Sequence, residues 1–293
     1  MAVPAAYLGI LLIWSTTPLG IKWSAEAGFL FGITARMVLA AVCFIGFALV
    51  FRRTIQVSKN VWPAYLVNGL GIYAAMMLLY WGAQFIPSGL MAVIFGLSPL
   101  TTGILSSIVL KERSMTVMKI GGSLVGVTGL LIVFGSQGEL PTNAGLGIMA
   151  TFGALVVYSV FIVTLKRIAR DIPTFSLTAA GVFISALAFA LTWIFSNQVI
   201  PVDAPSRSYL AIIYLAVVGS VVGFLLFFYI LRRIAATKVA LVTLITPVTA
   251  LILGGLLNNE ILPPQIWIGA GVILAGLLIH HLGDLLTQVF RQG

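Results

Sequence analysis

The chain has 293 residues, of which 60% are hydrophobic and only 8% are charged. Soluble proteins carry about a quarter charged residues and less than half apolar ones, so this composition excludes an ordinary water-soluble globule. The formal net charge of +9 would suit a nucleic-acid surface or the cytoplasmic loops of a membrane protein. The single cysteine, Cys43, lies in an apolar run. It therefore excludes a disulfide framework and a thiolate cluster for a structural metal.

Apolar stretches organise the chain, and each is a candidate membrane span. A helix needs about 20 apolar residues to cross the bilayer core. The first stretch lacks the basic segment that opens a signal peptide, so we interpret it as a retained helix. We predict an all-α membrane protein with ten transmembrane helices, at 5–21, 29–50, 61–81, 88–110, 116–134, 145–165, 174–195, 209–231, 239–257 and 265–280.

Basic residues indicate how the chain is oriented. The breaks after the second, fourth, sixth and eighth stretches, counted with the first turn of the next stretch, hold three Lys or Arg each, or twelve of the sixteen. Cytoplasmic loops carry such an excess, so we expect both termini in the cytoplasm. The positive charge is then explained by the orientation of the chain in the bilayer and by contact with anionic lipid, and nucleic acid is not needed as a partner. The residues are Arg52, Arg53 and Lys59; Lys111, Arg113 and Lys119; Lys166, Arg167 and Arg170; and Arg232, Arg233 and Lys238.

Internal repetition divides the chain into two halves, 1–137 and 138–293. A shift of 144 residues places Trp14 on Tyr158 and Ser15 on Ser159. A shift of 148 residues places Ser98-Pro99-Leu100-Thr101 on Thr246-Pro247-Val248-Thr249, and Glu112 on Glu260. Each half has five helices, and because five is odd, the halves must cross the membrane in opposite senses. Inverted repeats of this kind are typical of transporters with a site near the bilayer midplane.

Several of these motifs also resemble a known family. They are Trp14-Ser15-Thr16, Arg36, and the spacing from Pro99 to Glu112 that recurs from Pro247 to Glu260, each time before a Gly-rich stretch. With them the chain resembles the EamA-like transporters of the drug/metabolite transporter superfamily over essentially its whole length. The resemblance implies the inverted ten-helix fold and the export of amino acids, other metabolites or drugs. Two departures, Tyr158 in place of a frequent Trp and Ala180 opposite Arg36, make the halves chemically different.

The paired prolines suggest the walls of a cavity. A proline inside a helix leaves the carbonyl four residues earlier without a partner, and lipid cannot satisfy that carbonyl. We interpret both proline helices as cavity walls, although a structural kink with a nearby hydroxyl on the carbonyl is the alternative. Each proline lies on a polar stripe, Ser98, Thr101 and Thr102 in the first half and Thr243, Thr246 and Thr249 in the second.

Aromatic residues near mid-depth complete the candidate site. Trp14 and Tyr158 have hydroxyl neighbours in Ser15, Thr17 and Ser159, which suggests a site with ring faces and hydrogen-bonding groups; helix packing is the alternative. Tyr73 shares a face with Met76 and Tyr80. Tyr80 and Tyr229 are candidate outer and inner gates, or residues of the interfacial aromatic belt. The predicted substrate-binding residues are Trp14, Ser15, Thr17, Arg36, Tyr73, Ser98, Pro99, Tyr158, Ser159, Thr243, Thr246 and Pro247.

Charged residues near the spans are few. Arg36 lies within a predicted span and is expected either to pair with Glu26 or helix carbonyls or to line the substrate path. Glu112 and Glu260 lie thirteen residues past the prolines, which is about 20 Å along a helix, and are expected to cap the following helices. All seven acidic residues fall in predicted loops or helix ends. A mid-depth carboxylate for proton exchange is therefore not expected.

These features predict a secondary transporter of a small, neutral or zwitterionic, amino-acid-like metabolite, working by alternating access and exporting its substrate. The location expected is a bacterial inner membrane. A cationic drug/proton antiporter and a passive channel are alternatives. An acyltransferase-like enzyme built on His280, His281 and Asp284 is a weaker one, and we expect no catalytic residue, metal or cofactor. Two glycine-rich faces predict helix packing or a homodimer: Gly121, Gly122 and Gly126, and Gly269, Gly271 and Ala275.

Overall fold

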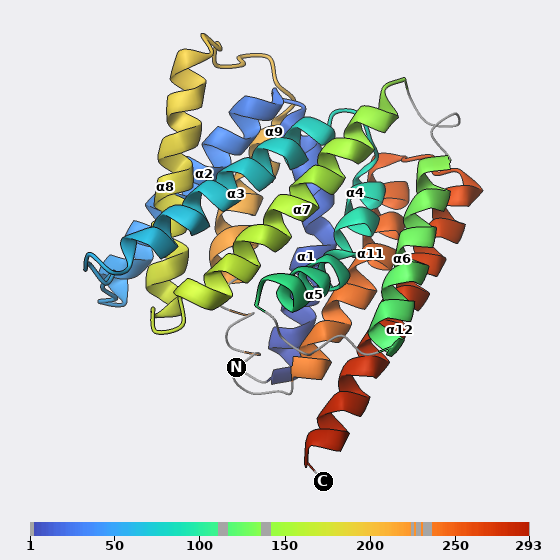
Figure 1. The fold of residues 1–293 in the computed structure, drawn as a ribbon. Coiled ribbons are helices and arrows are strands. Elements are labelled where there is room, and N and C mark those ends of the chain that lie inside the picture. The colour runs from blue at the N-terminus through green and yellow to red at the C-terminus, as the bar shows by residue number, and fades with distance from the viewer. Residues whose placement is uncertain are drawn as a thin grey trace.

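The computed structural model describes residues 3–110, 117–135, 142–223 and 236–292, together with residues 226 and 230. Side chains at 134, 236–241, 243, 244 and 284–292 lie outside that description. Every regular element in the described part is a helix (Figure 1), as predicted. Seven helices there are long and apolar enough to cross a membrane, and shorter apolar helices cover 117–133, 206–222 and 245–258.

The helices fall on all ten predicted apolar stretches. In the first half they are α1 (Val3–Ala25), α2 (Phe29–Val50), α3 (Trp62–Gly82), α4 (Ser88–Phe95), α5 (Ser98–Val109) and α6 (Val117–Gly135). In the second half they are α7 (Ala144–Ile168), α8 (Thr174–Phe195), α9 (Ser206–Tyr214), the π-helix η2 (Leu215–Val222), α11 (Ala236–Asn258) and α12 (Pro264–Gln292).

The bundle has two ends, which we call upper and lower as they are drawn in Figure 1. Both termini lie at the lower end, together with the α2–α3 and α7–α8 connections. The α1–α2, α3–α4 and α8–α9 connections lie at the upper end. The lower connections carry the basic residues Arg52, Arg53, Lys59 and Arg170. The described basic loops therefore share one end with the termini, which is the arrangement that the positive-inside prediction requires.

The two halves interlock. Helix α1 packs on α9 and α11 of the second half, and α7 packs on α3 and α5 of the first. Across the interface, α2 also contacts α8, α4 contacts α11, and α6 contacts α12. The first helix of each half thus packs on helices of the other half, so the helices named above form one bundle.

The most extensive contact joins α6 and α12, side by side in Figure 1, and glycines make it close. A Cβ added to Gly122 would lie 2.6 Å from the Gly276 carbonyl oxygen, and one added to Gly129 would lie 2.8 Å from that of Gly269. Small residues allow such approach of helix backbones. A Cβ at Gly121 or Gly271 would meet nothing within 4 Å. Much of the glycine-rich surface is therefore used within the chain, and the homodimer stays a prediction.

The two proline motifs differ in conformation. The expectation that Pro99 lies inside an unbroken helix is wrong, because α4 ends at Phe95 and α5 begins at Ser98 with Pro99 in its first turn. Proline is well placed there, since the first helical N–H groups have no partner inside the helix. Pro247, in contrast, lies inside the unbroken α11. The motifs meet, because a Cβ added to Gly96 would lie 2.9 Å from Cγ of Pro247.

The eighth stretch contains the other departure from a regular α-helix. Residues Leu215–Val222 form a π-helix, and the Ser220 hydroxyl donates to the Leu215 carbonyl at 3.0 Å. The residue Gly20 of α1 faces this segment, since a Cβ added to Gly20 would lie 3.0 Å from Cδ2 of Leu215. Widened π turns are frequent at functional sites, and this one follows directly after a helix that lines a pocket, described below.

Candidate functional site

Two hydrogen-bonded hydroxyl pairs lie near the middle of α1, α7, α11 and the Ser88–Val109 span. The Ser15 hydroxyl of α1 and the Thr249 hydroxyl of α11 are 2.5 Å apart. The Ser159 hydroxyl of α7 is 2.7 Å from the Thr101 hydroxyl of α5. Thr102 donates a further bond to Ser159 at 3.2 Å. Ser15 and Ser159 are buried, and their partners are half-buried.

The internal repeat relates these two pairs to each other. The shift that matches Ser15 to Ser159 and the shift that matches Thr101 to Thr249 convert one pair into the other. One bond joins α1 to α11 and the other joins α7 to α5, so each bond crosses between the halves. The sequence placed Thr101 and Thr249 on polar stripes but did not show that they bind the serines, because that contact depends on how the halves interlock.

The matched aromatic residues lie in two separate hydrophobic clusters. Trp14 is half-buried and packs against a cluster that includes Ile10 and Val242. The Tyr158 ring packs on Phe95 at 6.0 Å and on Phe161 at 5.3 Å, measured between ring centroids. Both rings therefore have packing partners next to the hydroxyl pair of their own helix, and their contact with substrate stays a prediction.

The remaining mid-depth residues bond mainly to their own helices. The Thr101 hydroxyl also lies 3.2 Å from the Ser98 carbonyl oxygen, and the Thr249 hydroxyl 3.0 Å from that of Thr246. Thr17 donates to the Ile13 carbonyl at 2.7 Å. None of these acceptors is the carbonyl four residues before Pro99 or Pro247, so the hydroxyl-bonded kink stays an alternative prediction. The side chain of Thr243 and the whole of Tyr229 lie outside the described residues.

Tyr73 points toward α8 rather than toward either hydroxyl pair. Its hydroxyl is 2.8 Å from that of Thr192, and its ring lies 4.7 Å from that of Phe189. Both partners belong to α8. Tyr73 thus helps to hold α3 against α8, and its place in a substrate site is a prediction that these contacts do not support.

Arg36 of α2 is buried and bonds to Tyr80 of α3 in its own half. It is 5% exposed, and its NH1 group donates to the Tyr80 hydroxyl at 3.3 Å. The Tyr80 hydroxyl also accepts a bond from the Ser24 hydroxyl at 3.2 Å. Within the described residues its Nε has no partner. The expected ion pair with Glu26 is wrong, because Glu26 binds Arg207 through two bonds of 2.7 and 2.8 Å. Tyr80 is fully buried in this cluster, and its role as a gate stays a prediction.

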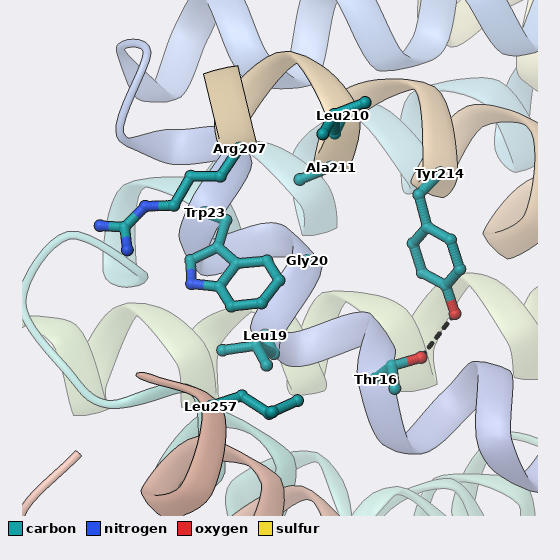
Figure 2. Close-up of a pocket in the computed structure, with 9 residues that line it drawn as sticks. All are labelled: Thr16, Leu19, Gly20, Trp23, Arg207, Leu210, Ala211, Tyr214 and Leu257. Atoms are coloured by element: carbon teal, nitrogen blue, oxygen red, sulfur yellow. Dashed lines mark hydrogen bonds between the residues drawn. The ribbon is translucent and has the colours of Figure 1, made fainter. Parts of the chain in front are cut away.

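A pocket of about 320 Å³ lies between α1, α9 and the upper end of α11 and is large enough for part of a small ligand. Figure 2 shows Trp23 and Arg207 at one end of it and the hydrogen bond between Thr16 and Tyr214 at the other. Leu210 and Leu257 are 67% and 54% exposed, so the pocket opens on the outer surface of the bundle. Its lining residues are Thr16, Leu19, Gly20, Trp23, Arg207, Leu210, Ala211, Tyr214 and Leu257.

Glu260 does not cap the helix that follows it. Its carboxylate accepts the backbone N–H of Ser88 at 3.0 Å and that of Gly89 at 3.2 Å, so it caps α4 in the other half. The expectation that it caps the next helix is therefore wrong, and Glu112 lies outside the described residues. Sequence reasoning also missed Trp23 and Tyr214, for which the internal repeat offers no signal. Of the acyltransferase-like residues, His280 is buried next to Gly103 of α5.

Comparison with known proteins agrees with this architecture. A sequence profile of the EamA-like transporter family matches residues 3–135 and 145–280. The chain is 28% identical over 294 residues to an S-adenosylmethionine/S-adenosylhomocysteine transporter of Chlamydia trachomatis serovar L2, covering 96% of this chain and 88% of that protein. It is 25% identical over 221 residues to a "Probable terminal-alkyne amino-acid exporter" of Streptantibioticus cattleyicolor, covering 73% and 71%.

A solved crystal structure has the same fold. It superposes with a TM-score of 0.67 over 96% of this chain and 97% of that chain, at 22% identity. The relatives named above are transporters, and the described helices are of membrane-spanning length. The protein is thus an integral membrane transporter of a small molecule and not an enzyme. Because the profile covers nearly all of both halves, the chain belongs to the EamA-like transporter family.

Proposed function

We propose that this transporter moves an amino-acid-like metabolite by alternating access between two inverted halves of five spans each. The observation that carries the proposal is the pair of repeat-related hydroxyl bonds, Ser15 with Thr249 and Thr101 with Ser159. Each bond crosses from one half to the other near mid-depth. When inverted halves rock against each other, such equivalent contacts are the ones that must rearrange around a midplane substrate.

The inverted topology is supported by the interlocked packing and by the basic loops at the lower end (Figure 1). In a Cys43→Ala background, Ser58→Cys at the lower end should react with an impermeant thiol reagent only from the cytoplasm. Gln198→Cys at the upper end should react only from outside. Both positions are exposed. Labelling of both from one side of the membrane would contradict the proposed topology.

The substrate class follows from the polar groups at mid-depth and from the relatives. Relatives named for S-adenosylmethionine and for a terminal-alkyne amino acid suggest a substrate with an amino-acid group. Hydroxyls can donate to a carboxylate and accept from an ammonium group, so they suit a zwitterion. Among the acidic residues whose side chains are described, Glu26, Asp171, Asp203 and Glu260 all lie in loops, so none of these four carboxylates lies at mid-depth to bind a cation.

Counterflow in liposomes tests this function. Vesicles that hold purified protein and are preloaded with unlabelled methionine or S-adenosylmethionine should accumulate the labelled compound at a rate that saturates with its concentration. The exchange should persist when a protonophore collapses the proton gradient, because no mid-depth acid takes part. Export predicts in addition that expression lowers the internal level of the exchanged metabolite in cells. Obligatory exchange of a quaternary cation for protons would favour the antiporter instead, and flux without saturation would favour a channel.

A further inference from the structure

A chain of hydrogen bonds joins the upper ends of the two halves. The Trp23 indole N–H of α1 donates to the side-chain oxygen of Asn258 at 2.8 Å. The amide nitrogen of Asn258 donates to the Glu260 carboxylate at 3.0 Å. That carboxylate then accepts the backbone N–H groups of Ser88 and Gly89 at the start of α4. We call these five residues the upper clamp.

The clamp supplies a cap that α4 lacks in its own half. The first N–H groups of a helix have no partner inside it, and the helix dipole attracts a negative charge to that end. The N-cap residue of α4 is Pro87, which makes no capping bond through its side chain. Bonds from N–H groups to a carboxylate are about twice as strong as neutral ones. The position of α4 therefore depends on an acidic residue of the other half.

Glycine leaves space for this carboxylate. A Cβ added to Gly254 of α11 would lie 2.4 Å from Oε2 of Glu260 and 3.1 Å from the Ser88 hydroxyl oxygen. The next residue differs, because a Cβ added to Gly255 would meet only the Glu260 carbonyl oxygen, at 3.9 Å. An alanine at position 254 would therefore displace the Glu260 carboxylate without changing any charge, whereas an alanine at 255 would fit.

Two other polar contacts at the upper end involve Arg207 and Lys22. Glu26 and Arg207 also join the halves, but their side chains are 25% and 54% exposed, and exposed ion pairs contribute little. Lys22 donates to the carbonyls of Ala83 and Ile86 at 2.6 and 3.0 Å, which fixes the α3–α4 connection beside the clamp. Among the described contacts at this end, the Glu26–Arg207 pair and the Glu260 carboxylate connect the halves, and Glu260 is the one that caps a helix of the other half.

We propose that the upper clamp is the gate at this end of the transporter, and that the structure is the state in which this gate is closed. Opening moves the Glu260 carboxylate away from the N-terminus of α4 and separates Trp23 from Asn258. Trp23 also lines the pocket (Figure 2), so the same movement opens the pocket toward the upper end. Glu260, Asn258 and Trp23 act as positioning residues. The gate rests on the proposed alternating access.

Thiol labelling tests the gate. Leu19 lies one turn below Trp23 and lines the pocket, yet it is only 3% exposed, so Leu19→Cys in the Cys43→Ala background reports on opening. In cells, an impermeant maleimide added outside should label it slowly. Gly254→Ala should raise the rate about tenfold, which corresponds to about 1.4 kcal/mol in the opening equilibrium. Gly255→Ala should leave the rate unchanged.

Glu260→Gln provides a second route, because the neutral amide weakens the cap without adding volume. It should also raise the labelling rate, whereas Asp203→Asn removes a charge in the α8–α9 connection at the same end and should not. Melting temperatures of the purified variants identify any variant that folds poorly. If Gly254→Ala folds poorly, the labelling rate of Glu260→Gln decides whether the gate exists. Equal rates for Gly254→Ala, Glu260→Gln and both controls in folded protein would overturn the gate. Labelling needs no substrate, so failed counterflow would count against the proposed function and not against this result.

Discussion

Replacing Gly276 with valine is expected to destabilise the transporter by about 3 kcal/mol, the upper part of the usual range for overpacking. A Cβ at this position would lie 2.6 Å from the Gly122 carbonyl oxygen and 2.6 Å from the backbone nitrogen of Gly126. These are backbone atoms of α6, so they cannot move away by a change of side-chain rotamer to make room for the valine. The α6–α12 contact, the most extensive in the bundle, would have to separate.

The measurement is the melting temperature and the monodisperse yield of the purified protein in detergent. Gly271→Val is the matched control on the same helix, because a Cβ there would meet nothing within 4 Å. It should melt like the parent chain. If Gly276→Val also melted like the parent, the close approach of the two backbones would be contradicted.

Removing one hydroxyl from either mid-depth pair is expected to reduce counterflow by about tenfold or more, which would mean a loss of at least 1.4 kcal/mol. Thr249→Val and Thr101→Val keep the side-chain shape and remove the bonds to Ser15 and Ser159. A neutral hydrogen bond contributes only about 0.5–1.5 kcal/mol to stability, so the folded protein should survive. Because the pairs are related by the repeat, the two variants should have similar effects.

The control for this experiment is Thr164→Val on α7, whose hydroxyl is exposed and donates only to the Val160 carbonyl of its own helix. It should leave counterflow unchanged. In addition, the double variant Ser15→Ala with Thr249→Val should lose less than the sum of the single losses, since both substitutions remove the same contact. Parallel losses of melting temperature and counterflow would show instead that the pairs serve only to pack the helices.

The sequence by itself determined the helical class and most helix boundaries. The predicted spans 29–50 and 174–195 are observed as Phe29–Val50 and Thr174–Phe195. The physical reason is the bilayer, which offers no hydrogen-bond partner to backbone N–H and C=O groups. A long apolar run therefore forms a helix, in which these groups bond to each other. The local matches between halves also identified Ser15 with Ser159 and Thr101 with Thr249 as equivalent residues.

Local sequence did not decide how matched motifs behave in their surroundings. Ser98-Pro99 begins a new helix after a break, whereas Thr246-Pro247 lies in an unbroken one, although the two motifs are equivalent in the repeat. The residue Gly96 lies two positions before Ser98 of the first motif and packs on Pro247 of the second. The two motifs therefore have different neighbours, and a proline motif alone does not specify whether the helix breaks before it or continues through it.

Only the tertiary structure decided which polar groups meet. Glu26 binds Arg207 instead of Arg36, Glu260 caps α4 instead of α12, and Trp23 and Tyr214 come together around a pocket. Side chains that face lipid and side chains that face other helices are both apolar here, so periodicity in the sequence does not reveal which face of a helix is covered. The interlocking of the halves sets those faces, and with them the partners that lie more than 150 residues away in the chain, such as Ser15 and Thr249.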